Sequence, residues 1–534
     1  MTNLFRDSMY QDIQDPSAKI DSLGEQVVSM DTKVGSPISS RNGYTYTSLP
    51  SWINEVDKRL FEDGINIKDR KYGAVGDGVS RPIYSSNPSA LAYPTFKTLP
   101  DMQVKYPALT NTFLTSIGID PATNAWQSLE LDWCAIQQAL KEGEWVNIPK
   151  GTYRINKVLD GYGARMRGYG RGQSKIVQYT NAEAVIMLGS VAYVSDLYFG
   201  HFGLPSAEVV PNGVGIDLSK YGLMDGAVLE RLYIENNTAG IYLGDDATTH
   251  IYSATLRDIR VTRFNYAGVY LSGFGHTGSR LDNIYVVNWN NYAAQTKLTA
   301  NYGFFFKGMN EGVFNQLNIE HGYYNKGTVI SGSNLEINSI HYEGYEPNGS
   351  FPTMFAIDGL ASRATVRNVS LVYSKIDTAK ATDFSFATLG DNGVLDIDGF
   401  YEQNNTVVGT PTLRKFFGSG TIVEGAAIYA RKFRMLANLF NSPDYFPITP
   451  IQPFLREYNY DRYYWSEGGK RIFVKSAIPT TGAYTAGDEV RNSNKAEVGT
   501  AGSKYVIFGW VRLTSGSAHV VGTDWLEMRM LTGN

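Results

Sequence analysis

Two glutamates 23 residues apart, Glu320 and Glu343, are the strongest candidates for catalytic groups in this chain of 534 residues. Paired carboxyl groups can cleave a glycosidic bond, because one donates a proton while the other acts as nucleophile or base. The two groups lie about 5–5.5 Å apart in a retaining enzyme and about 6.5–9.5 Å apart in an inverting one. Their mutual repulsion raises the pKa of one carboxyl group, which then serves as the acid. The pair predicts glycoside hydrolysis if the fold makes the two residues neighbours.

Further polar and aromatic side chains lie close to these glutamates in the sequence. His341 is the third candidate catalytic group. Flat aromatic rings beside paired acids suit a sugar, whose C–H face stacks on tyrosine or tryptophan. We expect the substrate to be bound by Trp289, His321, Tyr323, Tyr345 and Arg260. The competing interpretation is structural, since exposed glutamates are common on long β surfaces and Glu320 would then pair with a neighbouring lysine.

A repeated apolar triplet supplies the elements that would bring the two glutamates together. Apolar residues at positions 0, +3 and +5 recur seven times, with spacings of 23 to 35 residues between copies. Glycine, asparagine and serine fill the intervals, which are too irregular for a propeller and carry no helical pattern for βαβ units. The pattern predicts a solenoid in which each coil packs on the next. The copies begin at Val194, Leu229, Leu256, Leu281, Phe314, Ile337 and Val366.

The triplet also fixes which side chains point outward. Positions +3 and +5 face the core, so positions +4 and +6 face outward by strand alternation. Position +6 then holds Glu320 and Glu343 on adjacent coils, with backbones ~4.8 Å apart. Position +4 holds Asn318 and His341 beside them. We expect position +8 to form an outward aromatic column that contains Trp289 and Tyr345.

The segment before the repeat carries a recognisable combination of motifs. Residues 71–78 read KYGAVGDG, an amphipathic helix with AIQQAL is expected over 128–143, and WVNIPKGTYRI begins at Trp145. This combination resembles the start of the pectate-lyase-like right-handed parallel β-helix family, in which a helix caps the first coil. The resemblance implies an all-β fold built on a right-handed parallel β-helix, or solenoid. Residues 81–127 are rich in Pro, Ser and Thr and aperiodic, so we expect an inserted surface excursion there.

The remaining segments predict three domains. Residues 1–70 form a short N-terminal helical or attachment region, with a brief heptad over 18–35. Residues 71–445 form the β-helix with its cap, and residues 446–534 form a C-terminal β module. The last domain contains G-x-Y-x-x-G-D-x-V-x-N from Gly482, followed later by Gly-Trp. This pattern resembles the terminal segments of phage tailspike proteins.

Taken with the β-helix motifs, the chain resembles a bacteriophage tailspike with capsular polysaccharide depolymerase activity. The resemblance implies a homotrimer on the virion tail that binds and cleaves bacterial capsule or O-antigen at the outer surface of the host. It implies docking on a virion tail or baseplate protein through the N-terminus. It also fits the first residues, which lack the apolar stretch of a secretory signal. The resemblance does not identify catalytic residues.

Composition excludes several other classes. The balance of 48 basic against 52 acidic residues, a formal charge of −4, provides no basic field for nucleic acid. The sequence contains no run of about 18 apolar residues, the length that a membrane-spanning helix needs. A single cysteine, Cys134, excludes a thiolate zinc cage, and we interpret it as a core residue. No metal and no cofactor are expected.

Three alternatives to a hydrolase remain open. A polysaccharide lyase on the same fold needs Arg, Lys or a bound cation beside a base such as His or Tyr, and it leaves an unsaturated uronate. Arg260 and His341 share position +4 but lie several coils apart. A receptor-binding fibre would adhere without cleaving. A secreted plant-wall lyase is disfavoured by the missing signal and by the heptad.

Overall fold

A computed structural model describes two short N-terminal strands and most of the chain from residue 64 onward. The described residues are 38–39, 45–46 and 64–532, with gaps at 144, 205–211, 222, 245–248, 289–298, 350–351, 359–361, 378, 382, 391–392, 410–412, 418–426, 435–463, 468–469 and 481–483. The chain divides into two compact units, residues 1–65 and 66–534. In the first, β1 (Ile38–Ser39) pairs antiparallel with β2 (Thr45–Tyr46). The heptad expected over 18–35 lies outside the described residues.

A capping helix closes the first coil of the second unit. Helix α6 (Leu131–Lys141) is buried on nearly every side, and Cys134 is fully buried in it, which confirms the core interpretation. The Asp132 carboxylate accepts hydrogen bonds from the backbone N–H groups of Val75, at 2.7 Å, and Gly76. Burial raises the pKa of Asp132 to about 6. The KYGAVGDG motif therefore wraps the acidic start of the cap helix.

The segment 81–127 differs from the aperiodic surface excursion that we expected. It buries the side chains of Met102, Tyr106, Leu114 and Trp126 against the cap region. Its helices are too short for a repeating apolar period, which explains why the composition alone was misleading. Threonine side chains cap three of them at the N-terminus. The helices of this segment are η2 (Pro88–Ala90), α4 (Leu99–Lys105), α5 (Asn111–Ser116) and η3 (Asn124–Ser128). The short strand β3 (Ile65–Asn66) precedes it.

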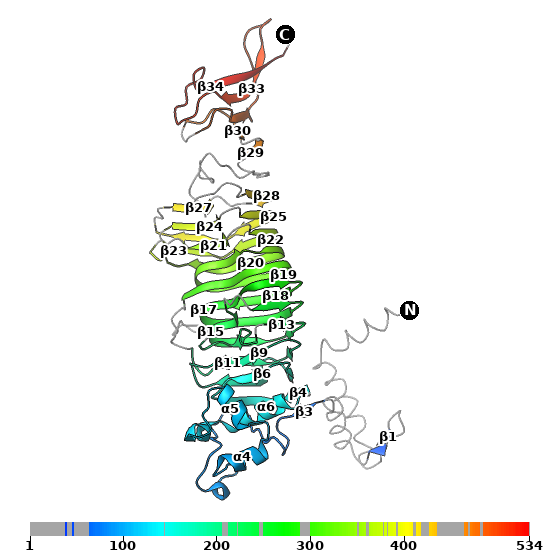
Figure 1. Cartoon of the computed structure of the whole chain (residues 1–534). Coiled ribbons are helices and arrows are strands. Elements are labelled where there is room, and N and C mark those ends of the chain that lie inside the picture. The colour runs from blue at the N-terminus through cyan, green and yellow to red at the C-terminus, as the bar shows by residue number, and fades with distance from the viewer. Residues whose placement is uncertain are drawn as a thin grey trace, which may run out of the picture. The chain divides into compact units, whose positions relative to one another are not determined.

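The central region is a parallel β-helix with three faces, which confirms the predicted fold class. Figure 1 shows its strands stacked coil upon coil from β6 to β28. The first coils use short strands, one for each face. Sheet 1 begins with β4 (Trp145–Ile148), β7 (Arg165–Gly168), β10 (Tyr193–Ser195) and β14 (Val228–Glu230). Sheet 2 begins with β5 (Gly151–Ile155), β8 (Ser174–Gln178), β11 (Tyr198–His201) and the first half of β15 (Tyr233–Leu243). Sheet 3 begins with β6 (Leu159–Gly161), β9 (Ile186–Leu188), β12 (Ile216–Asp217) and the second half of β15.

Later coils use long strands that bend around the corners and so contribute to more than one sheet. They are β17 (Thr255–Thr277), β18 (Arg280–Val287), β19 (Thr299–Ser331), β20 (Asn334–Pro347), β22 (Arg363–Val372), β25 (Val394–Gln403) and β28 (Ala427–Arg434). Shorter strands complete sheet 3 and the outer turns. They are β13 (Leu223–Asp225), β16 (His250–Tyr252), β21 (Thr353–Asp358), β23 (Lys375–Asp377), β24 (Asp383–Leu389), β26 (Thr406–Val408) and β27 (Leu413–Phe417).

The apolar triplets form the core in the register that the sequence predicts. Every residue at positions 0, +3 and +5 of the seven copies is at most 2% exposed. The seven first residues are strand partners in sequence order, from Val194 with Leu229 to Ile337 with Val366. Burial fixes this register, because a slip of one residue would turn each triplet toward solvent.

A ladder of glycines marks the corner between sheets 2 and 3. A Cβ atom on any of them would meet a carbonyl oxygen of the next coil at 2.8 Å or less. The glycines therefore permit the close approach of successive coils at this corner. The ladder consists of Gly215, Gly240, Gly268, Gly303 and Gly327.

The C-terminal module is a separate, mostly antiparallel sheet. Its small core contains Tyr484, Val490, Trp510 and Trp525, residues that belong to the tailspike-like motif or follow it. The strands are β29 (Tyr464–Glu467), β30 (Lys470–Lys475), β31 (Glu489–Asn492), β32 (Glu497–Val498), β33 (Tyr505–Arg512) and β34 (Trp525–Leu531).

Two searches of the described residues gave negative results. None of their helices combines the length and the apolar character needed to cross a bilayer. Within the same ranges, no group of three or more His, Cys, Asp and Glu side chains could hold a metal ion.

Candidate functional site

The two candidate glutamates are neighbours on the outer face of sheet 2. Glu320 of β19 and Glu343 of β20 are strand partners, and so are Asn318 and His341. Adjacent parallel strands place such partners ~4.8 Å apart at the backbone. We call Glu320 and Glu343 the carboxylate pair. The register on which the pair depends is confirmed.

Core packing determines that both glutamates face outward. Leu317 and Ile319 of β19 are fully buried, and Ile340 and Tyr342 of β20 are buried above them. Because side chains alternate along a strand, residues 318, 320, 341 and 343 lie on the opposite, outer face. The carboxylate pair is therefore held by two rigid strands rather than by loops.

The pair is electrostatically asymmetric. Partial burial raises the pKa of Glu320, and the nearby charge of Glu343 raises it further. The charges of Arg260, His321 and His341 oppose this shift. His341 Nε2 lies 3.1 Å from Glu343 Oε2, so an imidazole faces the second carboxylate. Glu320 is thus suited to hold a proton, while the second carboxyl group has an imidazole within contact distance.

A glycine corner separates the carboxylate pair from the next stretch of chain. Gly344 has φ +58°, and a Cβ atom there would lie 2.3 Å from His321 Nδ1. The His321 ring therefore packs over Gly344 of the neighbouring coil. His321 itself has φ +39°, in the left-handed region. Both coils leave the extended conformation directly after their glutamate.

This corner reverses the orientation that we expected for Tyr345. Its side chain is fully buried and stacks on Tyr324 with ring centroids 5.1 Å apart. Its hydroxyl donates to the carbonyl of Thr353 at 3.3 Å. The prediction of an outward ring at position 345 is wrong, because the left-handed residue at 344 breaks strand alternation.

The remaining predicted residues have different surroundings. Lys380 donates to the Tyr323 hydroxyl, and its Nζ lies 4.0 Å from the centroid of that ring. Arg260 is exposed at position +4, three coils before His341 by way of Tyr285 and Asn318. Its charge nevertheless acts on Glu320. Trp289 lies outside the described residues.

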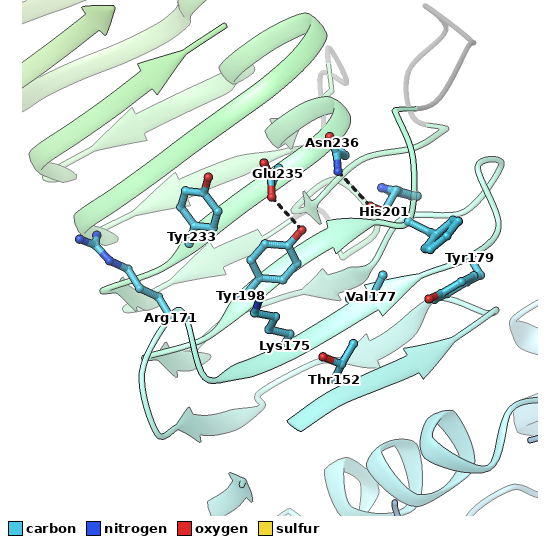
Figure 2. Close-up of a pocket in the computed structure, with 12 residues that line it drawn as sticks. Thr152, Arg171, Lys175, Val177, Tyr179, Tyr198, His201, Tyr233, Glu235 and Asn236 are labelled. Atoms are coloured by element: carbon cyan, nitrogen blue, oxygen red, sulfur yellow. Dashed lines mark hydrogen bonds between the residues drawn. The ribbon is translucent and has the colours of Figure 1, made fainter. Parts of the chain in front are cut away.

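The sequence interpretation missed a pocket of about 370 Å³ on the same face. It lies among earlier coils, where β5, β8, β11 and β15 run side by side (Figure 2). We call it the lower pocket. It is lined by Thr152, Arg171, Gly172, Lys175, Val177, Tyr179, Tyr198, His201, Phe202, Tyr233, Glu235 and Asn236.

Hydrogen bonds fix the polar wall of the lower pocket. The Tyr198 hydroxyl donates to Glu235 Oε2 at 3.1 Å, and burial followed by the Glu235 charge raises the pKa of Tyr198 (Figure 2). Both ring nitrogens of buried His201 are engaged, one with Asn237 Oδ1 at 2.8 Å and the other with the Glu183 carbonyl at 2.9 Å. Burial lowers the pKa of His201.

A sequence signal for this pocket existed but lay outside the seven triplets. Lys175, Tyr198 and Tyr233 are strand partners in one column, which leads on to Arg260. Arg171, Lys175 and Tyr179 precede the first triplet copy at Val194. Aligning the coil before Val194 with the outward positions of the triplets would have predicted that these residues lie near Glu235.

Comparison with known proteins gives weak similarities only. No family model and no curated protein matches this chain. The enzymatically active domain of tailspike protein 2 from bacteriophage CBA120 is similar, with 12% identity over 93% of this chain and 72% of that chain and a TM-score of 0.43. The gp42 tailspike of Acinetobacter phage vb_AbaP_AS12 has 11% identity over 87% of this chain and 93% of that chain, with a TM-score of 0.39. The catalytic domain of a GH87 alpha-1,3-glucanase in complex with nigerose has 13% identity over 56% of this chain and 62% of that chain, with a TM-score of 0.26. Such low values assign no activity to this chain.

Proposed function

We propose that this chain is a depolymerase that hydrolyses a bacterial surface polysaccharide at the carboxylate pair. One observation carries the proposal: Glu320 and Glu343 are strand partners on an outer face, and the pKa of Glu320 is raised by burial and by its partner's charge. Stability gives no reason to align two like charges at this distance. Glycoside hydrolysis requires two neighbouring carboxyl groups, one of which holds a proton, and a raised pKa suits Glu320 to that task.

The proposed reaction assigns a separate task to each carboxyl group. Glu320 donates its proton to the glycosidic oxygen while the Glu343 carboxylate attacks the anomeric carbon, which forms a glycosyl ester and releases the leaving sugar. Ionised Glu320 then removes a proton from water, the water oxygen attacks the anomeric carbon, and Glu343 is released. Adjacent coils favour the ~5–5.5 Å separation of a retaining enzyme. His341 is placed to orient Glu343.

The biological setting of the proposal is a phage tailspike. It is supported by the motif resemblance at both ends of the chain and by the parallel β-helix between them. In this setting the chain forms a homotrimer on the virion tail and docks on a tail or baseplate protein through its N-terminal region. It then acts outside the host cell on capsule or O-antigen.

The reaction class can be tested by digesting a panel of bacterial capsules in heavy-oxygen water (H₂¹⁸O). Hydrolysis places the heavy oxygen at each new reducing end, and mass spectrometry detects it. Glu320→Gln and Glu343→Gln should abolish this product. Glu336→Gln is the matched control, because Glu336 lies on the same coil as Glu343 but in sheet 1, paired with Arg367.

A polysaccharide lyase is the second candidate, favoured by the composition of the lower pocket. Arg171 and Lys175 could neutralise a uronate there, with Tyr198 beside them. Tyr198 is a poor base, however, since its hydroxyl donates to Glu235 and its pKa is raised. A lyase would give an unsaturated product without heavy oxygen. A receptor-binding fibre would leave glycan length unchanged.

A further inference from the structure

The lower pocket has an excess of positive charge. Arg171 and Lys175 line it, and among the described residues neither forms an ion pair with a carboxylate. Glu235 is the one acidic side chain of the twelve that line it. Its charge is already engaged by the Tyr198 hydroxyl and by Arg263, whose Nη1 lies 3.9 Å away. Two cations are therefore available to an anionic ligand.

Aromatic rings frame these cations. Tyr179 and Phe202 stack with ring centroids 4.6 Å apart, and Phe202 is 70% exposed. Tyr198 and Tyr233 form a second, tilted pair with centroids 5.6 Å apart. Figure 2 shows Arg171 on one side of Tyr198 and Tyr179 on the other. Lys175 Nζ lies 5.6 Å from the centroid of the Tyr198 ring, so this cation contacts an aromatic face and no carboxylate among the described residues. A pocket lined by both aromatic rings and cations suits a ligand with an apolar face and a negative charge.

One polar atom of the wall is buried without a partner among the described residues, and it belongs to the corner residue Asn236. Asn236 has φ +58°, and its buried Oδ1 atom has no hydrogen-bond partner in the structure. Its Nδ2 donates to the His201 carbonyl at 3.3 Å. Arg263 has the same left-handed conformation at this corner of the next coil, so the backbone there is a feature of the fold. The unsatisfied acceptor is unfavourable, and a ligand that donates a hydrogen bond would satisfy it.

The lower pocket is distinct from the carboxylate pair. Glu235 reaches Glu320 through the strand partners Thr262 and Val287, which makes three coil steps. At ~4.8 Å per step the backbones are separated by about 14 Å. The exposed side chain of Arg260 lies on a coil between them, in the neighbouring +4 column. A chain of sugars that runs across successive coils, parallel to the axis of the β-helix, can therefore contact both regions at once.

We propose that the lower pocket binds an anionic hexose unit, one that carries a carboxylate or phosphate group, through Arg171 and Lys175. The inference rests on the proposed function in one respect, namely that the unit belongs to the polysaccharide that the carboxylate pair cleaves. The sugar ring packs on Phe202, the exposed aromatic side chain of the pocket, and Glu235 accepts hydrogen bonds from hydroxyl groups. The pocket thereby selects acidic polysaccharides and holds them for cleavage three coils away.

The test is binding of single sugars to the full chain by saturation-transfer NMR. The probes are glucuronate, galacturonate, a glucose phosphate and glucose. Charge-assisted hydrogen bonds should make at least one anionic sugar bind about tenfold more tightly than glucose. Added salt should weaken that binding but leave glucose unaffected. The comparison of uronates with the phosphate identifies the anionic group.

Variants locate the binding site. Arg171→Gln combined with Lys175→Gln should remove the preference for anionic sugars. Arg165→Gln is the control, because Arg165 is an exposed cation of the same coil on β7 in sheet 1. The melting temperature of each variant reports whether it is folded. The salt titration is carried out on the parent protein, so it tests the charge dependence of binding even if a variant fails to fold.

Three results would overturn the inference: no anionic sugar binds, glucose binds as tightly as the anionic sugars, or the double variant keeps the parental preference. These results are separable from failure of the proposed function, because single-sugar binding does not require cleavage. If the protein binds glucuronate but cleaves no capsule, the inference about the lower pocket stands and the proposed hydrolase function is wrong.

Discussion

The carboxylate pair and the lower pocket occupy the same outward column of sheet 2 but have opposite electrostatic character. Position +6 holds Glu235 in one region and Glu320 with Glu343 in the other. At the pair, a second carboxylate lies on the adjacent coil. At the pocket, the adjacent coil provides Gly200, and the cations come from β8 and the turn before it. The difference shows that the residues on adjacent coils determine what a glutamate at position +6 is suited to do.

The two regions are therefore suited to different tasks. Burial and the charge of Glu343 favour the protonated form of Glu320, which is the requirement for proton donation. Arg171 and Lys175, which form no ion pair with a carboxylate in the described part of the chain, favour an anion, which is the requirement for binding. A division of this kind lets remote contacts hold the substrate while the reacting bond lies elsewhere.

The largest expected effect is the loss of cleavage in Glu320→Gln and Glu343→Gln. General acid and base groups contribute about 10²–10⁴-fold to rate, so kcat should fall by that order in each variant. Reducing-end formation on a digested capsule measures it. Glu336→Gln should retain the parental kcat. Parental rates in both active-site variants would assign the chemistry to another part of the chain.

Coil stacking between the two regions can be broken at Gly268. A Cβ atom there would lie 2.4 Å from Val286 Cγ1 and 2.8 Å from the Gly303 carbonyl oxygen. Overpacking of this kind costs about 1–3 kcal/mol, so Gly268→Ala should lower the melting temperature. Differential scanning calorimetry provides the measurement. Gly203→Ala is the comparison, since no atom lies within 4 Å of a Cβ there and its φ is not positive. Equal melting temperatures for the two variants would mean that close coil approach at the ladder is unimportant.

Charge removal at the lower pocket should alter binding rather than chemistry. Arg171→Gln with Lys175→Gln should raise KM for an acidic capsule about tenfold and leave kcat near its parental value. Initial rates over a range of capsule concentrations separate the two constants. A fall in kcat as large as that of Glu320→Gln would place the reaction in the pocket instead and would favour the lyase.

The smallest expected effect is a pH shift on removal of Arg260. The positive charge of Arg260 favours ionised Glu320 and so lowers its pKa. Arg260→Gln should raise that pKa, which keeps the acid protonated to higher pH. Because the rate falls as Glu320 loses its proton, the basic limb of the kcat profile should move upward in pH. An unmoved or downward-shifted limb would contradict the role of Glu320 as acid.

The sequence predicted the parts of this arrangement that burial enforces. The apolar triplets set the register, and the register made Glu320 and Glu343 neighbours with His341 beside them. Tyr345 was misplaced, because position +8 lies beyond Gly344, whose left-handed conformation no alternation rule anticipates. The domain boundaries and the roles of the site residues remain predictions.

The lower pocket was missed for a different reason. Its cations come from a turn and a strand that precede the first complete triplet, so no repeated pattern marked them. The glycine ladder was also present in the sequence, as Ala239-Gly240 and Ala267-Gly268, but it carries no apolar period. Irregular coils and corners follow local backbone conformation, which a periodic template does not capture.

Azide rescue tests the shared action of Glu320 and Glu343 most directly. Glu343→Ala should cleave a digestible capsule oligosaccharide only when azide replaces the missing carboxylate. The glycosyl azide formed should have the anomeric configuration opposite to that of the substrate. Glu320→Ala should give the azide with the original configuration, because Glu343 still forms the ester. Cleavage by either variant at the parental rate without azide, or one configuration from both, would contradict the account.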